Sequence, residues 1–221
     1  MRAPFLLLSL ALIVGCAGPG SGPPPGVMTY PGELQAIDTV PGGFFWRQHV
    51  VGHLAAGAAG PGSPAREEGF DAAVQKRGAR LTVIGLAPWG SRAFTLVQDG
   101  KAVTFTKELD EELPFPPEAI LQDLHRAWFK GWTGAARPDG THTSRAPDGE
   151  TITERWEAGR LFERRFARQD APGPNGPAAE IVVTYGEGLA DLGAPPRQVV
   201  LDNGWFGYRL EVETLEARRL E

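Results

Sequence analysis

Short runs of alternating apolar and polar residues, separated by turn signals, fill most of the chain after residue 40. One pair of runs, at 93–97 and 102–106, flanks Asp99-Gly100. Asp-Gly between two such runs favours a tight hairpin, because the turn requires positive φ at both of its central residues. On each arm, apolar side chains alternate with threonines, so each arm has one apolar face. The pattern therefore predicts antiparallel strands joined by short turns.

Strand-like segments rich in aromatic and β-branched residues recur along the chain, each bounded by Gly, Pro, Asn or Asp. Besides the pair around Asp99-Gly100 they lie at 44–51, 81–86, 151–157, 161–167, 180–185, 199–201 and 208–212. We expect roughly eight to ten strands. Three segments rich in Gly, Pro, Ala or polar residues are expected to be loops, at 55–68, 131–149 and 169–177. No internal repeat and no linker between two cores is evident, so one domain is predicted over 27–221.

One helix is expected among the strands, beginning at Pro117. Proline suits the first helical position because its missing N–H is not needed there. Apolar side chains then form one stripe at helical spacing: Ile120, Leu121, Leu124 and Trp128. Polar side chains occupy the opposite face: Gln122, Asp123 and Arg126. A helix of this pattern either completes a core or covers a lipid cavity as a lid.

The amino terminus has the features of an export signal. A basic start precedes an apolar run over 5–14, which is too short to cross a bilayer, since crossing takes ~20 apolar residues. Small residues then precede Cys16, and this resembles the bacterial lipobox, whose cysteine is diacylated before the leader is removed. We expect a signal peptide at 1–15, a lipidated Cys16 and a flexible tether over 16–26, which is nearly all Gly, Pro, Ala and Ser. The alternative is an ordinary leader with a chance cysteine.

Cys16 is the single cysteine of the chain, so an internal disulfide is excluded. Several acyl chains on this residue would form a stable membrane anchor, whereas one chain binds only marginally. The next residue is Ala17 rather than Asp, which resembles the sorting signal for the outer membrane in enterobacteria. The sequence therefore predicts a protein lipid-anchored at the cell outer membrane, on its periplasmic face.

Residues with catalytic or metal-binding patterns are scarce. His49 and His53 are four residues apart in a strand-like segment, and neither cysteines nor clustered acids complete a metal set around them. A Gly-x-Ser-x-Gly motif is absent. The net charge of −5 disfavours nucleic acid, whose binding depends on Lys and Arg. We predict no enzyme, no cofactor, no metal and no nucleic-acid partner.

The tryptophans beside glycines, Trp89, Trp132 and Trp205, are candidates for a cavity rim or a membrane surface, with a core position as the alternative.

Four blocks of sequence resemble a group of uncharacterised bacterial lipoproteins. They read LTVIGLAPWG at 81–90, FTLVQDG at 94–100, PFPPEAILQDL at 114–124 and VVLDNGWFGYRLEV at 199–212. This group is similar in design to LolA and LolB, which carry lipoproteins across the periplasm and receive them at the outer membrane. The resemblance implies a mainly antiparallel β (α+β) fold, an incomplete, curved barrel around an apolar cavity with one or two covering helices. It also implies binding of acyl chains or of a lipoprotein client.

The residues agree with that implication, because many strands have an apolar face and only one helix is available to cover them. Acyl chains in the remaining space would gain ~0.8 kcal/mol per buried CH₂. The candidate cavity lining comprises Val83, Phe94, Leu96, Val103, Phe105, Ile120, Leu124 and Trp128. We expect non-covalent acyl binding in lipoprotein or lipid transfer. The rival hypotheses are a structural or assembly lipoprotein with a filled interior, and a hydrolase with a histidine, a carboxylate and a nucleophile in one cleft.

Overall fold

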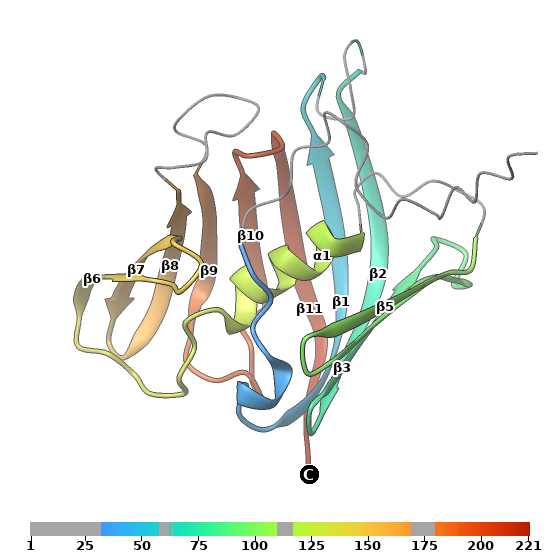
Figure 1. Cartoon of the computed structure of the whole chain (residues 1–221). Helices are drawn as coiled ribbons and strands as arrows, with labels where there is room; N and C mark the ends of the chain where they lie inside the picture. Colours follow the sequence, from blue (N-terminus) through green and yellow to red (C-terminus); the bar gives the residue numbers. More distant parts are fainter. Residues whose placement is uncertain (1–31, 58–61, 63, 110–116, 169–179) are drawn as a thin grey trace, which may run out of the picture.

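The described part of the chain forms a single antiparallel sheet of eleven strands (Figure 1). The computed structural model describes residues 32–57, 62, 64–109, 117–168 and 180–221. The predicted signal peptide, Cys16, the tether and the predicted loop at 169–177 lie outside the described residues. The sheet is curved and not closed, and one short helix lies on its concave side, so the predicted incomplete barrel with a covering helix is confirmed.

The chain builds the sheet outward from its middle and then returns from the opposite edge. The outward strands are β1 (Gly43–Leu54), β2 (Arg66–Arg77), β3 (Arg80–Leu86), β4 (Arg92–Asp99) and β5 (Ala102–Lys107). The returning strands are β6 (Gly140–Arg145), β7 (Thr151–Glu157), β8 (Arg160–Ala167), β9 (Ile181–Leu189), β10 (Gln198–Asn203) and β11 (Tyr208–Leu220). β11 pairs with β1, so the sheet order is β5-β4-β3-β2-β1-β11-β10-β9-β8-β7-β6. β5 and β6 are therefore the two edges of the open barrel.

Two hairpins of the sheet have different turn geometry. Between β7 and β8, Ala158 and Gly159 both have positive φ, of 49° and 71°. Between β4 and β5, Asp99 pairs with Ala102 across the turn, and Gly100 is the residue with positive φ, at 57°. The expectation of positive φ at both Asp99 and Gly100 is therefore wrong. The turn is centred one residue later and places its glycine first, the arrangement of a type II′ hairpin.

Two strands occupy segments that were expected to be partly loop. β2 begins at Arg66, inside the predicted loop 55–68, and β6 lies inside the predicted loop 131–149. β6 is mostly exposed and has no apolar face. It is an edge strand, and backbone pairing to β7 holds it in the sheet. In β2 the residues that face the core include Ala72 and Val74, whose small side chains give a weak alternation.

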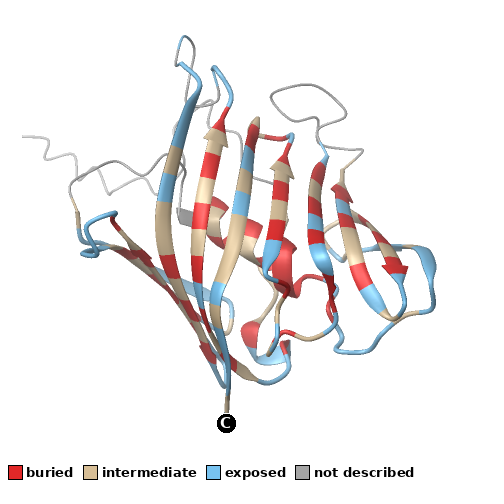
Figure 2. Cartoon of the chain, turned by 180° about the vertical axis from the view of Figure 1, so that it is seen from behind, coloured by how far each residue is buried: buried red, intermediate tan, exposed pale blue. Residues whose placement is uncertain are grey.

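The core lies on the concave side of the sheet. Along the strands buried residues alternate with more exposed ones, visible as bands in Figure 2. On β1 this alternation buries Phe44 and Trp46, whose rings stack at 4.0 Å between centroids. Trp46 also contacts Trp128, at 4.9 Å. These aromatic contacts fix the helical segment against the middle of the sheet.

The helical segment consists of α1 (Pro117–Leu124), which begins where predicted, and a π-helical turn, η2 (His125–Phe129). In Figure 1 it crosses the concave face in front of β10, β11 and β1. A 3-10 turn, η1 (Ile37–Thr39), precedes β1. None of the helices in the described part of the chain is long and apolar enough to cross a bilayer.

The polar face of α1 is not in contact with solvent, because Gln122, Asp123 and Arg126 are all buried. The Gln122 side chain donates to the carbonyl oxygen of Gly32 at 2.6 Å, so the segment before β1 covers this face. Arg126 is paired with Glu150, which follows β6. Polar partners from other parts of the chain therefore replace water around the helix.

Candidate functional site

A cavity of about 250 Å³ lies on the concave face beside α1. Its wall is formed by β1, β2, β3, β4, β10, β11, α1 and η2, and most of the residues in it are apolar. The volume is close to the lower end of the range for small-molecule pockets, about 300–1,000 Å³. The space is therefore large enough for part of a small apolar ligand.

Five of the eight residues predicted for the lining lie in the wall, namely Val83, Phe94, Ile120, Leu124 and Trp128. The other three do not belong to it. Leu96 is fully buried in the core. Phe105 is partly buried and contacts Phe94, with the two ring centroids 6.3 Å apart. Val103 is 37% exposed, because it lies on the edge strand β5, beyond the reach of the covering helix.

Much of the wall was not predicted, because it comes from strands far away in the sequence. β1, β10 and β11 contribute Val50, Val199, Leu201, Leu210 and Val212. Each of these strands shows apolar alternation in the sequence. That alternation does not reveal that β11 pairs with β1, and only this pairing brings their faces into one wall.

Two glycines leave space in the wall. A Cβ on Gly85 would lie 2.2 Å from the ring of Phe94, which is its cross-strand partner, so this ring lies directly over the glycine. Gly52 faces the same side as Val50, and a Cβ there would meet nothing closer than Leu210, at 3.5 Å. Larger residues at 52 would therefore project into the cavity, whereas at 85 they would displace Phe94.

The turn between β3 and β4 forms part of the rim. Ala87 and Pro88 belong to the wall, and the adjacent Trp89 is 65% exposed. Trp132 and Trp205, the other two candidates for a rim or membrane surface, are buried, and Trp132 stacks on Trp156. Of the three tryptophans beside glycines, Trp89 is thus the one at the rim.

Three wall residues carry strongly polar side chains. Glu68 is paired with Arg66 at 3.2 Å. Asp123 accepts a short hydrogen bond from the Tyr208 hydroxyl and lies 3.8 Å from Arg126. Gln48 is 3% exposed, and its Nε2 has no hydrogen-bond acceptor among the described residues. The polar part of the wall therefore consists of two acids, one amide and the Tyr208 hydroxyl.

Buried ion pairs lie among the apolar core residues on the concave side next to β6, β7 and β8. Arg126 donates to Glu150 at 2.9 Å, and Lys130 bridges Glu150 and Asp148, the latter at 2.7 Å. Burial alone would raise the pKa of Asp148. Hydrogen bonds from Lys130 and from two backbone N–H groups instead lower this pKa to about 2.

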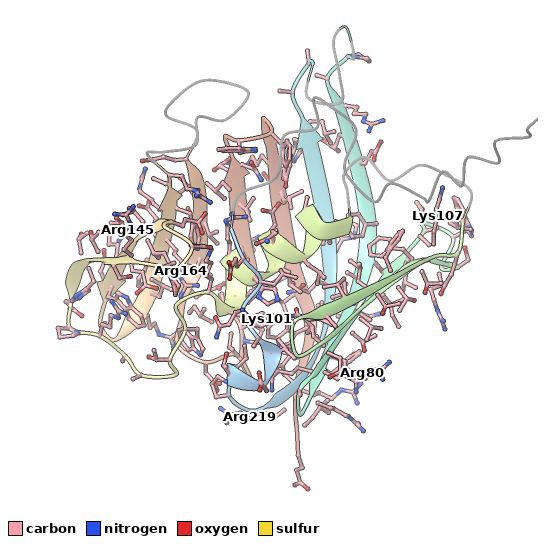
Figure 3. All side chains as sticks on the ribbon, viewed as in Figure 1. Arg80, Lys101, Lys107, Arg145, Arg164 and Arg219 are labelled. Carbon is pink, nitrogen blue, oxygen red and sulfur yellow. The ribbon has the colours of Figure 1, made fainter. Side chains whose placement is uncertain are left out.

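A second buried pair extends this ionic region toward β8. Arg164, on β8, donates from Nε to Glu154 at 2.9 Å and from Nη1 to the carbonyl oxygen of Arg126 at 3.2 Å. Figure 3 labels Arg164 within the sheet, whereas the labelled Arg80, Lys107 and Arg219 lie at the periphery. The Tyr185 hydroxyl, on β9, donates to the carbonyl oxygen of Ala127 at 2.6 Å, and burial raises its pKa to about 12. Both side chains bind the backbone of η2 and hold it in place.

The four histidines lie outside the cavity wall. His125 accepts a hydrogen bond at Nδ1 from the backbone N–H of Gln35 and donates from Nε2 to Gln98, at 3.2 Å and 2.7 Å. Burial, with smaller contributions from Lys130 and Arg126, lowers the pKa of His125 to about 3, so it is neutral. His49 faces the opposite side of the sheet and is 2.7 Å from Asp71.

An open antiparallel barrel with an apolar cavity under a single helix is the class of protein that this fold and site define. The chain belongs to the family described as Protein of unknown function (DUF3261), whose model matches residues 51–216. The predicted membership of an uncharacterised family is thereby confirmed. No protein with a curated description matches the chain in sequence.

The solved structures that are similar to this one include the following two. The first is a domain assigned as an outer membrane lipoprotein-sorting protein from Vibrio parahaemolyticus, with a TM-score of 0.44 and 9% identity, over 81% of this chain and 87% of that domain. The second is a DUF1329 family protein from Desulfovibrio piger, with a TM-score of 0.30 and 9% identity, over 83% of this chain and 87% of that protein.

Proposed function

We propose that this protein is a lipid-anchored component of the bacterial cell envelope that holds acyl chains non-covalently in its cavity during transfer of a lipid or a lipoprotein. The observation that carries this proposal is the unfilled, mostly apolar space between α1 and β1–β4. Each CH₂ buried there would contribute ~0.8 kcal/mol. Binding and release need no covalent chemistry, and the proposal assigns no catalytic residue.

Two further features support a position at a membrane surface. The sequence predicts acylation of Cys16, which would tether the domain, and the exposed Trp89 lies at the cavity rim. Tryptophan is favoured where apolar and wet surroundings meet, because its ring is apolar and its N–H is polar. We infer that the rim faces the membrane and that the periplasmic face of the outer membrane is the site of action.

Displacement of a fluorescent fatty-acyl probe tests acyl binding. The chain expressed from Ala17 onward suits the measurement, because it carries neither leader nor acyl anchor and keeps every described residue. We expect saturable binding and competition by unlabelled acyl compounds. Fluorescence that rises without saturation, or a signal that competitors leave unchanged, would contradict the proposal.

The second candidate function is a structural or assembly role through protein contacts. It is favoured by the closely filled concave side next to β6, β7 and β8, where apolar side chains and buried ion pairs leave the interior solid. The same displacement experiment separates the two candidates, because a scaffold has no reason to bind acyl probes at the cavity beside α1.

A further inference from the structure

The side chain of Gln48 has an unusual position in the cavity wall. It lies on the concave face of β1 between Trp46 and Val50, paired across the sheet with Ala72 on β2 and Thr214 on β11. It is 3% exposed, and among the described residues no acceptor binds its Nε2. A buried amide donor without a partner is unfavourable, and native proteins leave few such groups. Because Gln48 belongs to the cavity wall, a rotation of its amide allows a ligand in the cavity to supply the missing acceptor.

The charges of the wall limit which acceptor that is. Its two ionisable carboxyl side chains are Glu68 and Asp123, and the wall contains no Lys, Arg or His among the described residues. Asp123 is already bound by the Tyr208 hydroxyl and lies close to Arg126. A ligand carboxylate would lose its water, gain no cation and face two acids. A neutral carbonyl oxygen accepts a hydrogen bond at no such cost.

We propose that the Gln48 amide donates a hydrogen bond to the carbonyl oxygen of a neutral acyl ester or acyl amide, which makes esterified or amidated acyl groups the ligands of this cavity and disfavours free fatty acids. The inference rests on the proposed acyl binding and names its substrate class. The apolar residues around Gln48 hold the hydrocarbon chain. Gln48 fixes how far the chain enters, because the carbonyl marks the start of the chain.

Competition against the fluorescent probe by three compounds of equal chain length tests this assignment: methyl decanoate, decanoate and decane. At about pH 8 decanoate is ionised, since an ordinary carboxyl pKa is about 4. We expect methyl decanoate to compete about tenfold more strongly than decanoate. In Gln48→Leu its affinity should fall about fivefold, the typical effect of one hydrogen bond, while that of decane stays constant or rises.

Gln48→Glu keeps the length of the side chain and removes the donor, so it should weaken methyl decanoate as well. His49→Leu, the neighbouring position on the opposite face of β1, is the matched control and should leave all three affinities unchanged. Urea unfolding of each variant verifies that it is folded.

Three results would overturn the assignment. Methyl decanoate and decanoate could compete equally in the wild-type protein, or Gln48→Leu could weaken decane as much as methyl decanoate, which would indicate a packing effect. In both cases acyl binding itself stands. Failure of all three compounds to compete would instead refute acyl binding and the role of Gln48 with it.

Discussion

The concave face of this sheet has two halves that are covered in opposite ways. The open half, formed by β1–β4 with β10 and β11, has apolar residues, one helix above it and a cavity of about 250 Å³. The closed half, formed by β6–β9, is filled by apolar side chains such as Trp156 and Phe166 together with buried ion pairs that include Arg126–Glu150 and Arg164–Glu154. The same curved sheet therefore supports both a hollow and a solid interior.

The comparison indicates that the cavity in the open half stays unfilled because residues of the closed half hold the helical segment. A curved sheet must cover its apolar face, and a single short helix would otherwise settle into the space beneath it. Here Arg164 and Tyr185 bind the backbone of η2, and Glu150 binds Arg126, so the helical segment is held from the closed half. The ion pairs keep the helix above the cavity and prevent its collapse.

Glu150→Gln tests this dependence most strongly. The substitution leaves Arg126 and Lys130 buried beside a neutral amide, and breaking one partner of a buried ion pair costs about 3–5 kcal/mol. We expect a loss of that size in the free energy of unfolding, measured with urea. The control is Glu157→Gln, whose pair with Arg155 is exposed and contributes about 1 kcal/mol or less. Equal effects for the two variants would show that the closed half does not support the fold as described.

The pH dependence of stability tests whether His125 is buried in its neutral form, in contrast to the charged Arg126 and Lys130, which are paired with Glu150. The folded-state pKa of His125 is about 3 and its ordinary value is 6.5, so the unfolded chain takes up a proton first as the pH falls. The contribution of His125 to the free energy of unfolding is therefore fully present above pH 6.5, and it declines as the pH falls from 6.5 toward 3. From about pH 8 to about pH 5 the loss is about 2 kcal/mol, at about 1.4 kcal/mol per pH unit below the unfolded pKa.

Urea unfolding at several pH values measures this loss, and His125→Gln should remove it. A wild-type protein whose stability is constant over the interval would contradict a buried, neutral His125.

Gly52→Leu tests the open half alone. The new side chain would project into the cavity without a close contact, so we expect at least about a tenfold loss of acyl-probe affinity, about 1.4 kcal/mol. Stability should remain within about 0.5 kcal/mol, because the position is in a strand where glycine is not required. Val51→Leu, on the opposite face of β1, is the matched control. Unchanged affinity in Gly52→Leu would place the probe elsewhere.

Trp89→Ser gives the smallest expected effect and concerns the rim of the open half. Loss of an exposed apolar ring should reduce partitioning onto phospholipid vesicles about fivefold, the effect of about 1 kcal/mol, and leave stability unchanged. Leu215→Ser is the control, since Leu215 is also a large exposed apolar residue but, unlike Trp89, is not adjacent in sequence to a wall residue. Equal reductions by both substitutions would show that the rim has no special contact with the membrane.

Local features of the fold could be predicted from the sequence, and contacts between distant segments could not. Hairpin turns, strand alternation and the start of α1 at Pro117 are set by neighbouring residues, and all of them form. The sequence did not reveal β2 or β6 as strands. In β2 the small side chains that face the core give only a weak alternation, and β6 is an edge strand with no apolar face. The five predicted wall residues lie on β3, β4 and the helical segment, while those of β1, β10 and β11 depend on long-range pairing.

The polar face of α1 shows a second limit. Asp123 and Arg126 are buried, although charged side chains are rarely fully buried unless they are paired. Their partners Tyr208 and Glu150 lie far away in the sequence, so the sequence contains no local sign of the pairing. Gln48 was missed for the same reason: an amide within an apolar strand becomes notable only when its neighbours are known.

The pairing of β1 with β11 also determines when this protein can become functional. Gly43 lies opposite Leu220 and Leu54 opposite Tyr208, so the centre of the sheet joins segments from the two ends of the described chain. During synthesis β1 leaves the ribosome long before β11, and the strand that β1 needs as its partner does not yet exist. Contacts of such long range make folding slow. Because β10 and β11 supply part of the cavity wall, the cavity cannot be complete before the last strand of the sheet has been synthesised.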